Sequence, residues 1–186
     1  MPNDTYNVLY LEDTKDNITL KEAIYDYLSF IHDEKTNTVE TNLDFDKIIK
    51  MPDDLKNLPA RLGSVGEEEL REKYRQNAEK YGYSNWYEWA VANWGTKWNS
   101  YDGHLIDTSL SFYTAWSPPL PVIKELSKLT GKVFVLDYVD KGGAYIGKYI
   151  SGPDGDFDEC FDNFSEAPQS WKEALGVDDL DYMEED

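Results

Sequence analysis

The sequence contains few of the residues on which redox and acid–base sites are built. One cysteine, Cys160, occurs among 186 residues, so no disulfide can form within the chain. Only two histidines, His32 and His104, are present, and no glycine-rich phosphate-binding loop occurs, because KGGAYIG reads as a hairpin. We therefore expect a protein that is not an enzyme and holds no cofactor.

The sequence also lacks long apolar runs. None approaches the roughly 18 to 20 residues that a membrane-spanning helix needs. The N-terminal stretch MPNDTYNVLYLED has neither a basic leader nor an apolar core, so it predicts no signal peptide. Together with the single cysteine, this indicates a protein of the reducing cytoplasm that does not bind membranes.

Basic residues are scarce as well. Eighteen lysines and arginines face 37 aspartates and glutamates, which gives a formal net charge of −19. Thirteen of the acids lie in residues 152–186, where Lys172 is the one basic residue. A surface of this charge repels nucleic acid and attracts basic partners, so we expect no direct binding to nucleic acid.

The N-terminal third carries strand and helix signals. TYNVLYL (5–11) is rich in residues that favour strands. Thr19 and Glu22 have the spacing of a capping box, and the apolar periodicity behind them predicts a helix as far as Ile31. HDEKTNTVETN (32–42) reads as a polar connection, and LDFDKII (43–49) as a short edge strand.

The remaining elements complete an α+β pattern. A Ser64–Glu67 capping box and an Asn85 N-cap predict two helices, which end at Gly82 and Gly95. Strands are expected at 108–116, 133–139 and 144–150, with helices at 121–131 and 170–176 and acidic loop after Gly152. Two β-α-β halves of this kind predict a ferredoxin-like antiparallel sheet with helices on one face. Residues 1–151 would form this domain, with a Trp-rich helical insertion at about 64–100, and residues 152–186 an acidic C-terminal extension.

Several stretches resemble a known family. They are Met1-Pro2-Asn3, LDFDKIIKMPDDL (43–55), SNWYEWAVANWGTKWNSYD (84–102) and FYTAWSPPLPVI (112–123). Over roughly residues 1–151 the chain resembles plasmid and phage proteins with the YubB-type ferredoxin-like domain, although Lys50 stands where that family would have proline. The resemblance implies the ferredoxin-like fold and a mobile genetic element as the source, and it implies no activity.

The tryptophans between residues 85 and 102 pose a choice between a binding site and a core. Trp86, Trp89 and Trp94 recur at helical spacing, so we expect them, with Trp116, to bury the insertion against the sheet. Beyond Gly95, Trp98 and Tyr101 are the members expected at the surface. An alternative function follows from that edge: a small-molecule site or active site formed by Lys97, Trp98, Tyr101 and His104.

Metal and thiol chemistry have weaker signals. Asp154, Asp156 and Asp158 alternate as in a calcium loop, but Glu159 and Ser165 stand where the loop requires glycine and glutamate. The acidic neighbours of Cys160 raise the pKa of a thiol, which argues against a reactive thiolate. We predict no metal site.

The acidic C-terminal fifth carries the leading functional hypothesis. Aromatic residues lie between its acids, which suits a protein interface. The expected partner-binding residues are Asp154, Asp156, Asp158, Glu159, Asp162, Trp171, Asp178, Asp179 and Asp181. The hypothesis is a phage protein that binds and inhibits a basic host protein acting on nucleic acid, of the anti-CRISPR or anti-restriction type, by nucleic-acid mimicry. The sequence leaves the target and the oligomeric state open.

Overall fold

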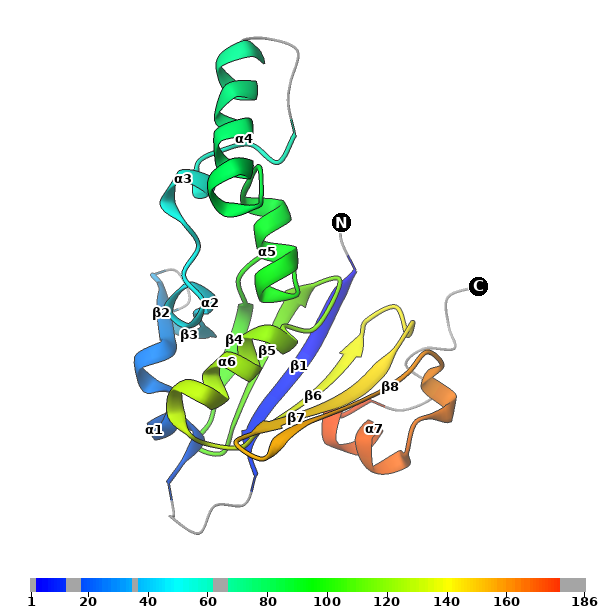
Figure 1. Ribbon diagram of the computed structural model, residues 1–186. Coiled ribbons are helices and arrows are strands. Elements are labelled where there is room, and N and C mark those ends of the chain that lie inside the picture. The colour runs from blue at the N-terminus through cyan, green and yellow to red at the C-terminus, as the bar shows by residue number, and fades with distance from the viewer. Residues whose placement is uncertain (1–2, 13–17, 35–36, 62–66, 178–186) are drawn as a thin grey trace.

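A computed structural model describes residues 3–12, 18–34, 37–61 and 67–177 (Figure 1). The elements in chain order are β1 (Asp4–Leu11), α1 (Leu20–Ile24), η1 (Tyr25–Tyr27), β2 (Leu28–Asp33), β3 (Thr38–Leu43), α2 (Phe45–Ile48), α3 (Asp53–Lys56), α4 (Glu67–Tyr81), α5 (Trp86–Trp94), β4 (Tyr101–Leu105), β5 (Ser109–Ala115), α6 (Leu120–Thr130), β6 (Phe134–Asp140), β7 (Ile146–Gly152), β8 (Gly155–Phe161), η2 (Phe164–Glu166) and α7 (Gln169–Leu175).

The main sheet has six antiparallel strands in the order β4-β5-β1-β6-β7-β8. β1 lies between β5 and β6, which are joined by α6. This arrangement is the split β-α-β unit of a ferredoxin-like sheet, completed by α1 and by β4 beside β5. The predicted fold class is therefore confirmed, and β7 and β8 extend the sheet beyond β6.

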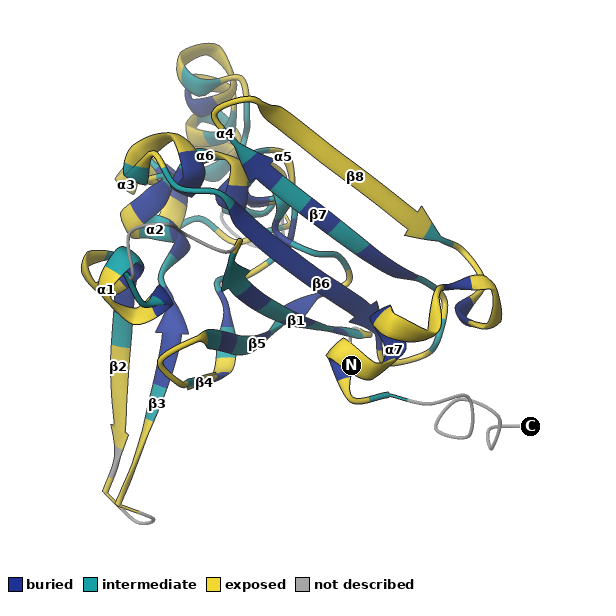
Figure 2. Cartoon of the chain, turned by 90° about the horizontal axis from the view of Figure 1, so that it is seen from below, coloured by how far each residue is buried: buried dark blue, intermediate teal, exposed yellow. Residues whose placement is uncertain are grey.

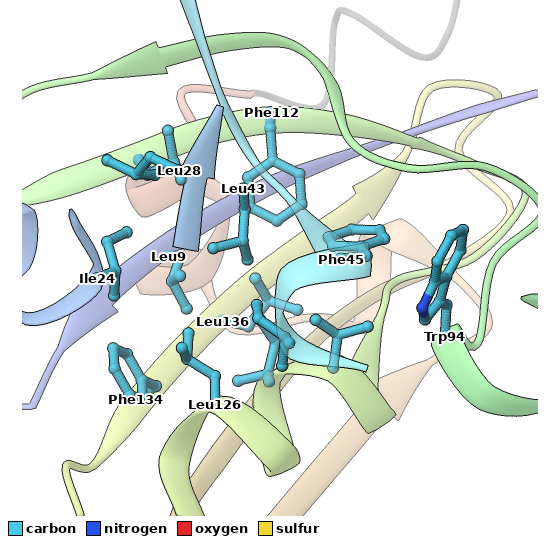
Figure 3. Close-up of a cluster of buried hydrophobic side chains, with 14 of the residues drawn as sticks. Leu9, Ile24, Leu28, Leu43, Phe45, Trp94, Phe112, Leu126, Phe134 and Leu136 are labelled. Atoms are coloured by element: carbon cyan, nitrogen blue, oxygen red, sulfur yellow. The ribbon is translucent and has the colours of Figure 1, made fainter. Parts of the chain in front are cut away.

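The first face of the sheet carries the main core. Strand residues alternate between the two faces, so Leu9, Phe112 and Leu136 all point to the same side and are fully buried. Side chains of α1, α2, α5 and α6 pack against them (Figure 3). Phe45 of α2 contacts both Phe112 and Trp94 edge-on, with ring centroids 6.3 and 5.9 Å apart. The short helix α2 thus joins the insertion to the sheet.

The second face is covered by α7 over β6 and β7. Trp171 and Leu175 of α7 form a smaller core with Val139 and Ile146. Figure 2 shows α7 at the end of β6 and on the opposite side of the sheet from α6. The prediction of helices on one face is thus confirmed for α1, α2, α5 and α6, which pack on the first face. Helix α7 lies on the second face, where no helix was expected.

Two N-terminal elements differ from the sequence prediction. The Thr19–Glu22 capping box forms as expected, but the helix ends at Ile24, and Leu28–Asp33 pairs with Thr38–Leu43 as a hairpin. The polar connection predicted for residues 32–42 was therefore wrong, and exposed His32 lies on β2. The edge strand predicted at residues 43–49 was also wrong beyond Leu43, where β3 ends, because the Asp44 side chain accepts a hydrogen bond from Asp46 N and caps α2.

Two further strands, β4 and β8, were not predicted. β4 contains Asp102, Gly103 and His104, for which no strand was expected. β8 forms where acidic loop was expected, because the turn Pro153–Asp154 folds the chain back onto β7 and pairs Gly152 with Gly155. The sheet therefore continues into the acidic segment. Ser64 of the predicted second capping box lies outside the described residues.

Candidate functional site

The acidic edge is the part of the described surface where the predicted partner-binding residues gather. We define it as β8 with the flanking residues Asp154 and Asp162. β8 is the last strand of the sheet and is exposed over nearly its whole length (Figure 2). Its side chains alternate, so Asp156 and Asp158 point to the α6 side while Phe157 and Glu159 point to the α7 side. Carboxylates on the same side of a strand lie about 7 Å apart.

Two of these carboxylates are held in place by neighbouring elements. Asp156 Oδ2 lies 2.5 Å from Lys124 Nζ on α6, and Asp156 Oδ1 accepts a hydrogen bond from Ser151 Oγ at 2.6 Å. The hydrogen bonds from Lys124 and Ser151 hold the pKa of Asp156 below its ordinary value. Tyr138 OH donates to Asp158 Oδ1 at 3.3 Å. The edge strand is therefore fixed to the domain through its α6-facing side.

Three other carboxylates point into solvent. Asp154, Glu159 and Asp162 are exposed and make no hydrogen bond or ion pair with any described residue. They are the acids of this edge that a partner could contact without first breaking an internal bond. Asp178, Asp179 and Asp181 lie outside the described residues.

Trp171 of α7 packs against the end of β8. Only 9% of its surface is exposed, and its ring lies 5.5 Å from that of Phe161 at the end of β8. Lys148 Nζ lies 5.8 Å from the same indole. In this structure Trp171 holds β8 and α7 together, and its ring does not face a partner.

A buried polar group lies beside α7. Asp137 is fully buried, its Oδ1 is 2.7 Å from Lys148 Nζ, and its Oδ2 accepts a hydrogen bond from Tyr10 OH at 2.8 Å. Burial lowers the pKa of Lys148, but the bonds to Asp137 and Tyr10 outweigh it and leave that pKa above its ordinary value. No hollow described on the surface opens onto this group, so we assign it to the fold.

The predicted small-molecule site is only partly assembled. Lys97 Nζ lies 4.4 Å from the Trp98 ring and 4.7 Å from the Trp116 ring. Tyr101 instead stacks on Tyr113 and donates a hydrogen bond to Asp4, and exposed His104 lies opposite Ser111 on β5. The structure brings Lys97 and Trp98 together, but it does not join them with Tyr101 and His104.

The tryptophans divide between core and surface. Trp89 and Trp94 are each 6% exposed, and Trp94 donates from Nε1 to the carbonyl of Ile49. Their predicted core role is confirmed. Trp116 was expected in the same core but is 43% exposed, because its backbone adopts φ 74° and turns the side chain outward after β5. Trp98 is 39% exposed, as expected for the outer edge.

Other sites are sparse in the part of the chain that the structure describes. No group of three or more His, Cys, Asp or Glu residues there could hold a metal ion. Desolvation, together with the carboxylates of Asp162 and Asp158, raises the pKa of Cys160. A hollow of about 440 Å³ lies between α6 and the β7–β8 turn, lined by Lys124, Lys128 and Asp156 among others. No described helix is long and apolar enough to cross a membrane.

Comparison with known proteins identifies one domain. Residues 93–176 match the family model described as the ferredoxin-like domain in Api92-like protein. The match runs from the end of α5 to α7, so it includes β8 and extends past the boundary at residue 151 expected from composition. No curated protein and no solved structure gave a match. Residues 93–176 are thus similar to the ferredoxin-like domain of Api92-like proteins, and β1 and α1, which precede the match, complete that fold here.

Proposed function

We propose that this chain is a non-catalytic protein that binds a basic, nucleic-acid-handling protein through its acidic edge and inhibits it. The observation that carries the proposal is the group of exposed, unbridged carboxylates at Asp154, Glu159 and Asp162, which lie on β8 or directly beside it. The backbone of β8 is already ordered by its pairing with β7, so it needs no ordering when a partner binds, which lowers the entropic cost of association.

Charge density decides what kind of mimicry is physically reasonable. Duplex DNA carries one charge per about 1.7 Å of axis, whereas a single strand carries one per about 3.4 Å. A β-strand with a carboxylate at alternate positions offers one per about 7 Å on each side. The free carboxylates of the acidic edge, Asp154, Glu159 and Asp162, are spaced more widely than this, so the edge alone has a lower charge density than either form of DNA. A mimic of DNA would also need the six acids of residues 178–186.

The target class follows from this charge and from the plasmid and phage proteins that the sequence resembles. In a host cytoplasm, a CRISPR effector or a restriction enzyme presents a basic groove that an acidic protein can enter. Electrostatic steering would speed association and make it sensitive to salt. The proposed role is that of an inhibitor encoded by a mobile genetic element.

The test uses the full chain in DNA-cleavage assays with an RNA-guided nuclease and a restriction endonuclease. The edge variant is Asp154→Asn/Glu159→Gln/Asp162→Asn. The control variant, Glu68→Gln/Asp102→Asn/Asp107→Asn, removes the same charge from exposed positions elsewhere. We expect the wild type and the control to inhibit one of the nucleases, more weakly at higher salt, and the edge variant to lose most of that inhibition.

Two outcomes would overturn the proposal. One is that the wild-type chain inhibits neither nuclease. The other is that the edge variant inhibits as well as the wild type does, which would separate inhibition from the acidic edge.

A second candidate is a small-ligand site at Lys97. The observation in its favour is that the Lys97 ammonium lies within 6 Å of three aromatic rings, those of Tyr87, Trp98 and Trp116. Bases could stack on the two exposed indoles while Lys97 contacts a phosphate. Titration of a nucleotide set against tryptophan fluorescence tests it, and a signal that Lys97→Met leaves unchanged would count against the site.

A further inference from the structure

Exposed apolar residues concentrate around the β2–β3 hairpin. Tyr25, Phe30, Ile31 and Val39 are each more than half exposed, at 51–56%. The other large exposed apolar residues of the described chain are spread over several elements. Scattered single residues of this kind are normal, whereas a contiguous group marks an interaction surface.

The hairpin holds these side chains on a defined surface. Buried Leu28 pairs with buried Leu43 at its base, so one face of the hairpin continues outward from the main core. Phe30 lies further along that face, with the Tyr25 ring 5.9 Å away, while Ile31 points to the opposite face. β2 therefore presents one exposed apolar side chain on each face, Phe30 on one and Ile31 on the other.

The outer edge of β2 carries backbone groups without partners. Asp44 N donates to Tyr27 O, which makes this a hydrogen-bonded pair of the antiparallel ladder. Because such pairs alternate, the N–H and C=O groups of Leu28, Phe30 and His32 point away from β3. Lys47 Nζ bonds the Leu28 carbonyl at 2.7 Å. No described residue bonds the outward groups of Phe30 and His32.

The hairpin is firmly attached on its other side. The Asn42 side chain accepts a hydrogen bond from Gly103 N at 2.9 Å, and Glu40 accepts one from Asp102 N at 2.7 Å. A Cβ on Gly103 would lie 2.0 Å from the Thr41 carbonyl oxygen, so glycine is required for this close approach. The outer edge of β2 is therefore presented from a fixed base.

The edge strands β2 and β8 differ in how many charged side chains they carry. Natural edge strands are usually protected by charged side chains. β8 follows this rule with Asp156, Asp158 and Glu159, whereas β2 has one acidic residue, Asp33 at its end, and no other acidic or basic side chain except His32. An edge strand with so few charges, in a protein of charge −19, indicates a strand that is covered in use.

We propose that β2 accepts an extended segment of a partner protein as an added strand. The segment would bond to the outward groups of Phe30 and His32 and carry apolar residues at adjacent positions, because β2 exposes an apolar side chain on each face, Phe30 and Ile31. Lys or Arg at its ends would match the exposed Asp26 and Glu34 beside the hairpin. The same acids, and a charge of −19 on each chain, disfavour a second copy as the occupant.

This inference does not depend on the proposed function, because β2 and β8 lie on opposite sides of the molecule in both views (Figures 1 and 2). The probe is a nine-residue peptide, Lys-Lys-Thr-Val-Val-Val-Thr-Lys-Lys, compared with a version in which glutamate replaces every lysine. The readout is amide hydrogen exchange of the full-length chain by NMR.

We expect the basic peptide to slow exchange at Phe30 and His32 by about tenfold or more, which corresponds to about 1.4 kcal/mol of protection. Ile31 should change little, because its N–H faces β3. His32→Pro, which removes an outward N–H, and Phe30→Ser should each abolish the effect. Val91→Ser, at an exposed position on α5, is the matched control and should leave it intact.

Three results would overturn the inference. The first is no protection by the basic peptide. The second is equal protection by the glutamate peptide, or loss of protection in the acidic-edge variant, since either would place binding elsewhere than at β2. The third is protection of Phe30 and His32 that rises with protein concentration without peptide, which would identify a second copy as the occupant.

Discussion

Trp116 holds the most unusual backbone conformation among the large residues of the described chain. At φ 74° it lies in the left-handed region, which is costly for a bulky side chain. Two hydrogen bonds fix it there: its N–H donates to the Asn3 carbonyl at 2.9 Å, and its carbonyl accepts from Tyr145 OH at 2.8 Å. The strain places an exposed indole beside Lys97, which is the feature that the small-ligand alternative requires.

This conformation predicts an inverted order of stability for two small substitutions. A left-handed conformation costs an L-residue about 1 kcal/mol that glycine avoids. Trp116→Gly should therefore unfold in urea with a free energy about 1 kcal/mol above that of Trp116→Ala. At Ser111, which lies within β5, the order should be the usual one, with glycine the less stable. Equal stability of the two Trp116 variants would show that the turn relaxes once the indole is removed.

Among the elements, β8 depends on α6 through one ion pair. Lys124 holds the pKa of Asp156 below its ordinary value, and Ser151 adds to this effect. A lowered pKa means that the carboxylate stabilises the fold above the ordinary carboxyl pKa, and that this contribution disappears as the pH falls through the folded-state value. The Lys124 side chain is 51% exposed, so solvent screening limits the contribution.

Asp156→Asn should therefore lower the free energy of unfolding by about 0.5 kcal/mol at pH 7. The difference between wild type and variant should shrink as the pH falls below the lowered pKa of Asp156, because the wild-type carboxyl then becomes protonated. Urea denaturation of both proteins from pH 7 to pH 2 measures it. A difference that stays constant over this range would assign the effect to the Ser151 hydrogen bond rather than to charge.

The elements also show where sequence reasoning succeeds and where it fails. β1, β5, α6 and β6 were predictable because each has a single clear periodicity, and Gly95 and Gly131 end their helices in the left-handed conformation as expected. The helix predicted from Leu20 to Ile31 was only partly correct, because its apolar residues fit both a helix and a strand. From Leu28 onward the chain forms a strand because it pairs with Thr38–Leu43.

β8 and the β2 edge were missed for a different reason. Acidic residues have low intrinsic preference for strands, so GDFDECF reads as loop unless the strand beside it is known. Its alternation of acids with Phe157 and Cys160 was the available signal. Which edge of a hairpin stays open depends on contacts such as those between Asn42 and Gly103, and these join residues 61 positions apart.

For the molecule as a whole, the acidic segment is part of the folded unit up to α7. Val139 and Ile146 are 1% and 0% exposed, and their cover on the second face includes Phe164 and Trp171. Removing everything after residue 151 would expose this core and leave β7 unpaired on one side. Removing residues 178–186 alone would leave every described contact in place.

A chain ending at residue 151 should therefore lose most of its stability, while one ending at residue 177 should keep it. Losing a single large buried aromatic residue costs about 3 kcal/mol, against a total of about 5–15 kcal/mol for a typical domain. Thermal unfolding and dye binding to exposed apolar surface distinguish the two. A stable, monomeric 1–151 chain would show that the domain ends before β8.

The difference in charged side chains between β2 and β8 has a consequence for self-assembly. End-to-end stacking of sheets into a fibre requires two adhesive edges on every subunit, so that each added copy leaves a new edge for the next. Here β2, in the two-stranded sheet, has an open edge, whereas β8, at one edge of the six-stranded sheet, carries acids that repel a second acidic strand. Pairing of two copies through β2 would use the open edge of both, so this association stops at a pair and does not continue into a fibre at high concentration.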